Sequence, residues 1–307
     1  MYTNNVAGVM HRSTILFLIV ATIAIAVTCG NDSPGSSSAN NGDTLSISQW
    51  RLPTELSFCG EKVPMNDPEV RERLEREFYV NVQSPGQIIL YIKRSARYFP
   101  MYERLLREKK MPDDLKYVSV AESALYMSKS PKDAVGLWQF IPATAKAMGL
   151  IVNEQVDERR QPEKSTVAAL KYLRDGYDSN GSWTNAAAGY NMGHTNFSSH
   201  REFQSTKEFY NLYLNEETSR YILRIIMVKY LMENAAQFGI IVPAEERYQA
   251  STTREVSEKN AVADLSVWAR ANGTTYRQVK LLNPWILGRG LPSPERGRQW
   301  EITLPAK

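Results

Sequence analysis

Hydrophobic residues recur at helical spacing through most of the chain between residues 65 and 235. An apolar face repeating every three or four residues predicts amphipathic helices, and no stretch in this region alternates convincingly like a strand. Proline lacks the N–H that a helix interior needs, so we expect the second of these helices to end at Pro100. The predicted helices lie at 69–78, 87–99, 163–177, 183–191 and 217–232, and they indicate a mainly α domain.

One helical stretch carries an isolated charge on an apolar surface. Glu122 is the only charged residue within 117–128. It shares a helical face with Leu115, Val118 and Leu125. Burial disfavours the ionised form of a carboxyl and raises its pKa, which is what a general acid needs near neutral pH. A structural glutamate that caps a neighbour or pairs with a buried arginine fits this helix equally well.

The pattern changes after a break at 243–248. Asp264 can cap a short helix that Gly273 ends, and a second short helix follows at 275–282. Residues 300–305 alternate like an edge strand, whereas the opening strand is indistinct where Val262-Ala263-Asp264-Leu265 stands. The C-terminal end is therefore predicted to form a small α/β module.

The beginning of the chain has the composition of an export signal. An apolar run from Ile15 to Val27 follows Arg12 and is too short to span a bilayer comfortably. Ala26-Val27-Thr28-Cys29 resembles a lipobox, so we expect Cys29 to carry lipid, the alternative being an ordinary cleaved signal. Residues 30–50 are rich in Gly, Ser, Asn and Asp and predict a flexible tether.

Charge and cysteine content narrow the classes of function. The 307 residues carry a formal net charge of +4, too slight for nucleic-acid binding without a basic block, though compatible with an anionic polymer. The only other cysteine, Cys59, would have no partner if Cys29 is lipidated, so a disulfide framework is not expected. Cys59 is interpreted as a small buried hydrophobe. With only His11, His194 and His200, neither a metal, another cofactor nor a Cys–His nucleophile is expected.

Four short motifs stand in order along the helical region. They are Ala121-Glu122-Ser123, Gly136-Leu137-Trp138-Gln139, Gly189-Tyr190-Asn191 and Glu217-Thr218-Ser219-Arg220-Tyr221-Ile222. Together they resemble the lytic transglycosylase family that cleaves bacterial cell-wall peptidoglycan, most closely its membrane-bound D type, from about Leu52 to Asn234. The resemblance implies a lysozyme-like helical catalytic domain. The C-terminal module resembles the peptidoglycan-binding LysM module.

In the resembled family one glutamate does all the proton transfer. It protonates the bond between N-acetylmuramic acid and N-acetylglucosamine, then deprotonates the muramoyl C6 hydroxyl, which closes a 1,6-anhydro ring. The resemblance assigns this role to Glu122. The motifs assign the remaining substrate-site roles to Ser123 as polar stabiliser, Gly136 for close backbone approach, Gln139 for sugar hydrogen bonds, Tyr190 to orient Glu122, Asn191 facing the cleft, and Tyr221.

Several of these assignments have structural alternatives. Ser123 could bond its own helix backbone, and Asn191 could simply stop a helix. One face of the helix that carries Tyr221 must pack in the core. Trp138 is interpreted as a core residue rather than a sugar platform.

Ordinary glycosidases need a second carboxylate, and the sequence offers none with a clear role. Asp133 lies on a polar loop, whereas Asp157 and Glu158 stand in a charge run interpreted as a solvated turn. A lone acid fits a reaction that activates no water. The alternatives are a goose-type lysozyme, which would need that second carboxylate, and a non-catalytic wall-binding lipoprotein.

The resulting organisation is a signal at 1–29, a tether at 30–50, a helical domain at 51–242 with its core at about 110–234, and a LysM-like module at 248–307. The expected partners are peptidoglycan strands and a membrane reached through lipidated Cys29, but not nucleic acid. The expected location is the periplasmic side of a bacterial envelope membrane, as an outer-membrane lipoprotein. The oligomeric state stays open.

Overall fold

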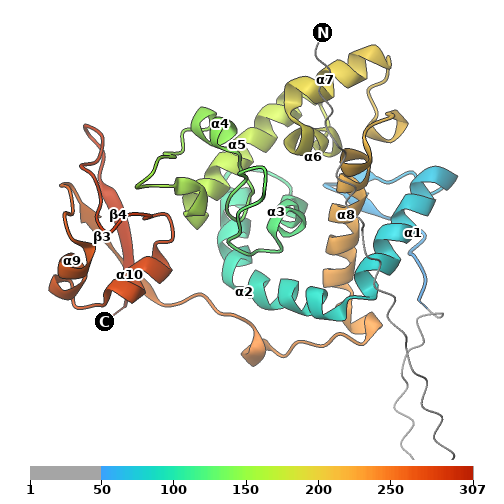
Figure 1. The fold of residues 1–307 in the computed structure, drawn as a ribbon. Coiled ribbons are helices and arrows are strands. Elements are labelled where there is room, and N and C mark those ends of the chain that lie inside the picture. The colour runs from blue at the N-terminus through green and yellow to red at the C-terminus, as the bar shows by residue number, and fades with distance from the viewer. Residues whose placement is uncertain (1–49, 307) are drawn as a thin grey trace, which may run out of the picture. The chain divides into compact units, whose positions relative to one another are not determined.

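The computed structural model describes residues 50–306, most of which are helical (Figure 1). The mainly α prediction is confirmed, and within this range the chain forms no strand between residues 65 and 235. The helices of this region are α1 (Pro68–Val82), α2 (Pro85–Glu108), α3 (Lys116–Ser123), α4 (Pro142–Ala147), α5 (Pro162–Asn180), α6 (Trp183–Met192), α7 (His194–Phe203) and α8 (Glu216–Glu233). A two-stranded hairpin, β1 (Ser57–Phe58) and β2 (Glu61–Lys62), precedes them. Short 3₁₀ turns lie at Asp113–Leu115, Glu158–Arg160, Phe209–Asn211, Ala235–Phe238 and Ala244–Glu246.

The expected end of a helix at Pro100 is wrong. Pro100 lies inside α2, which continues to Glu108, and Figure 1 shows this helix changing direction along its length. A proline costs the helix one hydrogen bond and bends it, but packing can hold the helix together on either side. Here Tyr102, Leu105 and Leu106 are buried after the proline and anchor the last turns of α2 to the core.

The helix that carries Glu122 is shorter than its pattern predicts. Asp113–Leu115 form a 3₁₀ turn, and α3 ends at Ser123. Ala124 and Leu125 adopt left-handed backbone conformations with φ of 55° and 54°, and Leu125 remains buried. Glu122 therefore lies in the last turn of α3, where the chain leaves the helix.

α3 lies in the middle of the helical domain, with α2 and α8 packed against it (Figure 1). The small residues Ala186, Ala187 and Ala188 are fully buried in α6 and allow close helix packing. The main contacts of α6 are with α5, α7 and α8. α7 was not anticipated from the sequence, and it begins directly after Gly193 ends α6.

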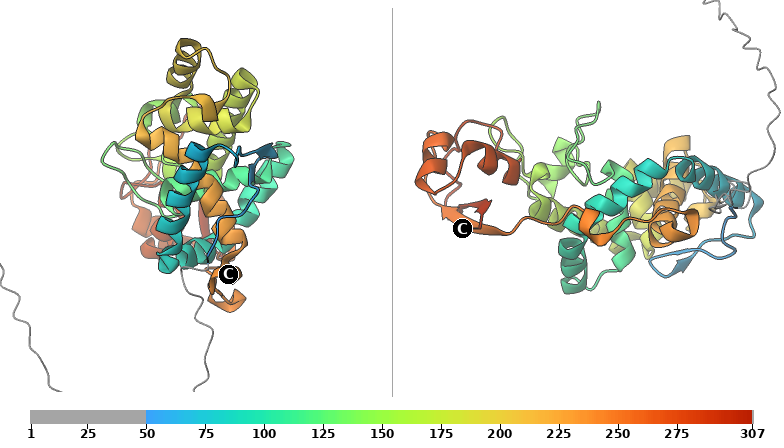
Figure 2. Two further views of the ribbon diagram at one scale, coloured as in Figure 1. Left: turned by 90° about the vertical axis from the view of Figure 1, so that its right-hand side faces the viewer. Right: turned by 90° about the horizontal axis from the view of Figure 1, so that it is seen from below.

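The C-terminal module consists of two short helices between two strands (Figure 2). Strand β3 (Thr253–Glu258) pairs antiparallel with β4 (Trp300–Pro305), and α9 (Leu265–Ala271) and α10 (Tyr276–Leu282) lie between them in sequence. The opening strand thus precedes the Val262–Leu265 segment. The N-caps are Asp264 for α9 and Thr275 for α10, the latter in a capping box.

The core of this module includes one residue from outside it. Val156 is fully buried among Leu265, Ile286 and Ile302. Its backbone also forms an antiparallel bridge with Ile286. The segment before the Glu158–Arg160 turn therefore packs with the C-terminal module.

The expected signal, Cys29 and nearly all of the tether lie outside the described residues. Within residues 50–306, no helix has the length and apolar character needed to cross a membrane.

Candidate active site

A cleft of about 570 Å³ opens beside the end of α3. Glu122 lines it together with side chains from the 130–144 segment, the end of α6 and the start of α8. Of the residues predicted from the sequence, Gln139, Tyr190, Asn191 and Tyr221 also line it. Four separate motifs thus contribute side chains to one cavity.

Glu122 is half-buried and has one hydrogen-bond donor. The hydroxyl of Tyr221 donates to its Oε1 at 2.5 Å. Burial raises the pKa of Glu122 from 4.5 to about 7, although the Tyr221 hydrogen bond and the charge of Arg224 both act to lower this pKa. A carboxyl with this pKa is partly protonated at neutral pH and can both donate and accept a proton.

The sequence predicted that Tyr190 would orient Glu122. In the structure, the hydroxyl that contacts Glu122 belongs to Tyr221 instead. Tyr190 donates instead to the backbone oxygen of Trp138 at 2.7 Å. Burial next to Glu122 raises the pKa of Tyr221 well above its usual value, so its hydroxyl stays protonated as a donor. The sequence could not choose between the two tyrosines because both lie on helices with a buried face.

Ser123 bonds the backbone, as its structural alternative proposed. Its Oγ lies 2.8 Å from the oxygen of Leu137 and 3.1 Å from that of Ser119, one helical turn earlier. Since one hydroxyl hydrogen serves both acceptors, Ser123 ties the end of α3 to the Gly-Leu-Trp-Gln segment. Ser123 does not line the cleft.

Gln139 has internal partners and still borders the cavity. Its Nε2 donates to the oxygen of Gly136 at 2.8 Å and lies 3.3 Å from that of Ser128. These bonds close the loop around residues 128–139. The carboxamide oxygen has no protein hydrogen bond within residues 50–306, so it remains available as an acceptor for a ligand.

Gly136 is required by the protein's own backbone. It has φ of +88°, and a Cβ placed on it would lie 2.1 Å from the carbonyl oxygen of Arg159. Only glycine permits both this conformation and this approach. The close approach expected of Gly136 is therefore made by Arg159, and Gly136 does not line the cleft.

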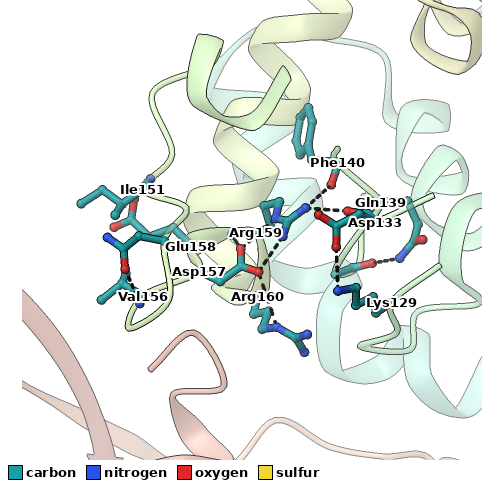
Figure 3. Close-up of polar contacts among 12 residues, drawn as sticks. Lys129, Asp133, Gln139, Phe140, Ile151, Val156, Asp157, Glu158, Arg159 and Arg160 are labelled. Atoms are coloured by element: carbon teal, nitrogen blue, oxygen red, sulfur yellow. Dashed lines mark hydrogen bonds and ion pairs between the residues drawn. The ribbon is translucent and has the colours of Figure 1, made fainter. Parts of the chain in front are cut away.

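The charge run at 157–160 is not a solvated turn, contrary to the sequence interpretation. Asp157, Glu158 and Arg159 are 4%, 3% and 4% exposed. Arg159 binds Asp157 through Nε and Nη2 at 2.8 and 2.9 Å (Figure 3). Glu158 pairs with Lys164 at 2.5 Å and accepts the N–H of Ile151 at 2.8 Å. Hydropathy suggested exposure because these partners are supplied only by the fold.

Arg159 connects this cluster to the loop beside the cleft. Its Nη1 donates to the backbone oxygens of Asp133 at 2.7 Å and Phe140 at 3.0 Å (Figure 3). Gln139 precedes Phe140 in that loop. The buried Asp157–Arg159 pair therefore supports the wall of the cleft without lining it.

Three charged residues of the cleft, Lys132, Glu217 and Arg224, were not singled out as site residues from the sequence. Glu217 lies at the start of α8 and forms a 3.5 Å ion pair with Lys132 across the opening. Arg224 follows Tyr221 by about one helical turn and lines the same cavity. Asn191 completes this wall, and its Oδ1 accepts a hydrogen bond from Thr218 at 2.9 Å. The sequence signal that could have identified Arg224 is its position about one helical turn after Tyr221, a residue of the fourth motif.

Other candidate groups have structural surroundings. Trp138 is 1% exposed, and its Nε1 donates to Thr166 at 2.9 Å, so it is a core residue. The ring of His194 packs against Gly176 and Gly189, and burial lowers its pKa. Cys59 is half-buried against the core, and burial raises its pKa. No group of three potential metal ligands from His, Cys, Asp and Glu occurs within residues 50–306.

Comparison with protein families identifies two domains. Residues 100–213 match the model of the transglycosylase SLT domain, and residues 254–307 match that of the soluble lytic transglycosylase C-terminal LysM-like domain. The chain contains an SLT transglycosylase domain. All the residues of the 121–191 motifs lie within the first match, whereas Glu217, Tyr221 and Arg224 lie beyond its end.

Comparison with individual proteins finds more distant similarities. Membrane-bound lytic murein transglycosylase D from two strains of Escherichia coli is 24% identical over 241 residues, which cover 76% of this chain. The chain spans about half the length of these curated relatives, 52%. The crystal structure of the 70 kDa soluble lytic transglycosylase from Escherichia coli aligns with a TM-score of 0.42 at 20% identity, covering 59% of this chain and 32% of that one.

Proposed function

We propose that this protein is a lytic transglycosylase that cleaves the β-1,4 bond between N-acetylmuramic acid and N-acetylglucosamine in peptidoglycan. The environment of Glu122 carries the proposal. A single half-buried carboxyl with a pKa of about 7 faces a cleft and accepts one hydrogen bond from Tyr221. The SLT domain match and the similarity to lytic murein transglycosylases support it.

In the proposed reaction Glu122 first donates a proton and then accepts one. Protonated Glu122 first gives its proton to the glycosidic oxygen, the bond from that oxygen to the muramoyl C1 breaks, and the N-acetylglucosamine hydroxyl leaves. The resulting carboxylate then takes the proton of the muramoyl C6 hydroxyl while O6 bonds to C1. Glu122 ends protonated, as it began, and no water is consumed.

Tyr221 suits this cycle because it has no need to change its own protonation. Its hydroxyl donates to one carboxyl oxygen of Glu122 and leaves the other oxygen to carry the transferred proton. A charge-assisted hydrogen bond is stronger to the carboxylate than to the neutral acid. Tyr221 therefore stabilises the ionised state formed after the first step.

Glu217 keeps the goose-type lysozyme as a second candidate. It places another carboxylate on the cleft, which a hydrolase needs to position water. However, the Glu217 side chain is 63% exposed and pairs with Lys132. An exposed, paired carboxylate is less suited to acting as a base on a bound water, so the transglycosylase reading is preferred.

Mass spectrometry of fragments released from purified peptidoglycan distinguishes the two reactions. A lytic transglycosylase leaves a 1,6-anhydromuramoyl end, lighter by one water than the reducing end a hydrolase leaves. Glu122→Gln controls for contaminating activity and should release nothing, while Glu217→Gln should still release anhydro products. Hydrated ends that disappear in Glu217→Gln would establish the lysozyme reading instead.

We further propose that the LysM-like module binds glycan and raises avidity for the wall, since tethering a second site raises the local substrate concentration. A chain truncated after Val242 should pull down less peptidoglycan while still cleaving it slowly. Truncation would also expose Val156, so the truncated protein should carry Val156→Ser to limit aggregation. Equal pull-down by full-length and truncated proteins would contradict the proposal.

For location, we propose an outer-membrane lipoprotein on the periplasmic side, anchored through Cys29. The support is the apolar run ending in Ala-Val-Thr-Cys and a relative named as membrane-bound. Cys29→Ala should move the protein from the membrane to the soluble fraction, since a stable anchor needs its attached acyl chains. Unchanged fractionation would exclude lipidation at Cys29 as the anchor.

A further inference from the structure

Arg224 is a cation that the protein itself leaves without a partner. Its side chain is half-buried on the cleft wall. Among residues 50–306 it forms no ion pair and no hydrogen bond, and its Nε is shielded from solvent without an acceptor. The ring of Tyr221 lies 5.9 Å from its guanidinium carbon and provides only a cation–π contact.

Other cations with similar burial are treated differently by the fold. Among half-buried cations, Arg220 pairs with Glu77 and Lys229 with Asp114, each at 2.7 Å. Arg94 and Arg201 have no ion pair, but each donates a hydrogen bond, to the backbone oxygen of Ala124 and to Asn180 respectively. Removing a charge from water without a counter-charge is costly, and proteins usually pair such groups. The unpaired state of Arg224 therefore suggests a ligand that supplies the missing anion.

The neighbouring carboxylates do not fill that role. Glu217 is engaged by Lys132 across the opening. Glu122 interacts with Arg224 only through space, where the positive charge acts to lower the pKa of Glu122. Glu122 accepts its hydrogen bond from Tyr221, and with a pKa of about 7 it is largely neutral in mildly acidic solution. Arg224 is thus free to bind an external acceptor in the same cleft.

We propose that Arg224 forms a subsite for a carboxylate carried by the muramoyl residue of the substrate, an inference that rests on the proposed function. The N-acetyl sugar rings themselves are neutral. The carboxylates belong to the muramoyl lactyl group, free when the stem peptide is absent, or to the stem peptide when it is present. A guanidinium binds a carboxylate through two parallel N–H···O bonds, which gives affinity and orientation together.

This subsite would make the cleft selective. A strand of N-acetylglucosamine alone offers Arg224 no carboxylate and leaves the buried cation unpaired. A hydrogen-bonding site discriminates strongly against a ligand that lacks the group it binds, because the site's own polar group is then left unsatisfied. Arg224 would thus favour muramoyl-containing strands over neutral, chitin-like ones.

Equilibrium binding tests the subsite without relying on turnover. Full-length protein carrying Glu122→Gln is titrated with soluble tetrasaccharides of three kinds: peptide-bearing muramoyl, peptide-free muramoyl and N-acetylglucosamine only. Adding Arg224→Gln should weaken binding of the carboxylate-bearing ligand about 10–100-fold, the range expected for a hydrogen bond between charged groups. Binding of the neutral tetrasaccharide should not change. The LysM-like module is the same in every variant and contributes equally.

Two matched variants complete the design. Arg224→Lys keeps the positive charge but lacks the guanidinium's two parallel N–H donors, so it should restore part of the lost affinity. Arg107→Gln removes an exposed positive charge that does not line the cleft and should leave all three affinities unchanged. If Arg224→Gln weakens only the peptide-free ligand, the lactyl carboxylate is the partner; if it weakens only the peptide-bearing ligand, the stem peptide is.

Equal loss for neutral and carboxylate-bearing tetrasaccharides, or no loss for any of them, would overturn the subsite. A role confined to the acidity of Glu122 is separated by the pH profile, which Arg224→Gln would then shift upward without changing KM. The outcome is also independent of the reaction type. Hydrated products from wild-type protein would remove the transglycosylase proposal but leave a carboxylate subsite measured by binding intact.

Discussion

Two groups of buried charges lie on either side of the same loop, and they differ in how they are satisfied. At 157–164, Asp157, Glu158 and Arg159 are almost completely buried, and each has a charged partner. In the cleft, Glu122 and Arg224 are half-buried and form neither an ion pair nor a hydrogen bond with each other. Figure 3 shows the paired group next to the loop that carries Gln139.

Burial alone therefore does not identify a functional charge. A paired, fully hydrogen-bonded charge holds two segments in register, as Arg159 does for the backbone at Asp133 and Phe140. A buried charge without a counter-ion can still be stabilised by binding a proton or a ligand of opposite charge. We infer that the first group is structural and the second is functional, and substitutions should separate them.

The largest expected effect is on activity in the cleft. Glu122→Gln keeps the size of the side chain but removes the transferable proton, so cleavage should fall by at least about 10²–10⁴-fold. Product release from purified peptidoglycan measures this. Asp157→Asn, which alters a carboxylate outside the cleft, should retain much more activity per folded molecule. Wild-type cleavage by Glu122→Gln would remove this residue from the mechanism.

The paired group should show its largest effect in stability. Arg159→Ala leaves buried Asp157 with only its longer 3.7 Å ion pair to Arg160, and it should lower the free energy of unfolding by about 3–5 kcal/mol. Urea denaturation measures the loss, with the exposed Arg107→Ala as control, expected within about 0.5 kcal/mol of wild type. A loss below 1 kcal/mol for Arg159→Ala would argue against the supporting role of this cluster.

Glu122 should have the opposite effect on stability, and the effect should depend on pH. Its pKa in the folded protein, about 7, lies above its ordinary value of 4.5, so the folded state binds more protons between these values. Glu122 therefore destabilises the fold as pH rises from 4.5 to 7, and this cost disappears below that window. Glu122→Gln should be more stable than wild type by about 1–3 kcal/mol at pH 8 and nearly equal at pH 4.

Thermal or urea unfolding at the two pH values checks this expectation. Glu77→Gln is a suitable contrast, because Glu77 is buried more deeply than Glu122 but pairs with Arg220, so the Glu77→Gln variant should be less stable than wild type. A Glu122→Gln variant less stable than wild type at pH 8 would mean that Glu122 is structurally paired after all.

The smallest expected effect concerns Tyr221. Tyr221→Phe removes a hydrogen bond that lowers the pKa of Glu122, so the pH above which activity declines should move upward. Loss of one such bond should reduce the maximal rate about 10-fold or less, apart from the profile shift. The pH dependence of product release measures both quantities. Tyr190→Phe, which loses a bond to the Trp138 backbone, should leave the profile in place.

Much of the site was predictable from the chain alone. Helical periodicity identified the mainly α class, and the isolated charge in an apolar stretch singled out Glu122. Both are local properties, since helix formation and the apparent burial of a face depend on residues within a few turns. The four motifs also brought Gln139, Tyr190, Asn191 and Tyr221 into consideration, and all four line the cleft.

Contacts between distant segments were decided only by the tertiary structure. Three features could not be predicted from the sequence. They are the hydrogen bond from Tyr221 to Glu122, 99 positions away, the burial of the Asp157–Arg159 pair, and the continuation of α2 beyond Pro100. In each case the free energy comes from partners that the fold supplies: a hydroxyl from α8, carbonyls from a loop, and a core that anchors both ends of a bent helix. Hydropathy and local propensity contain no information about such partners, and for that reason the unpaired Arg224 became visible only in three dimensions.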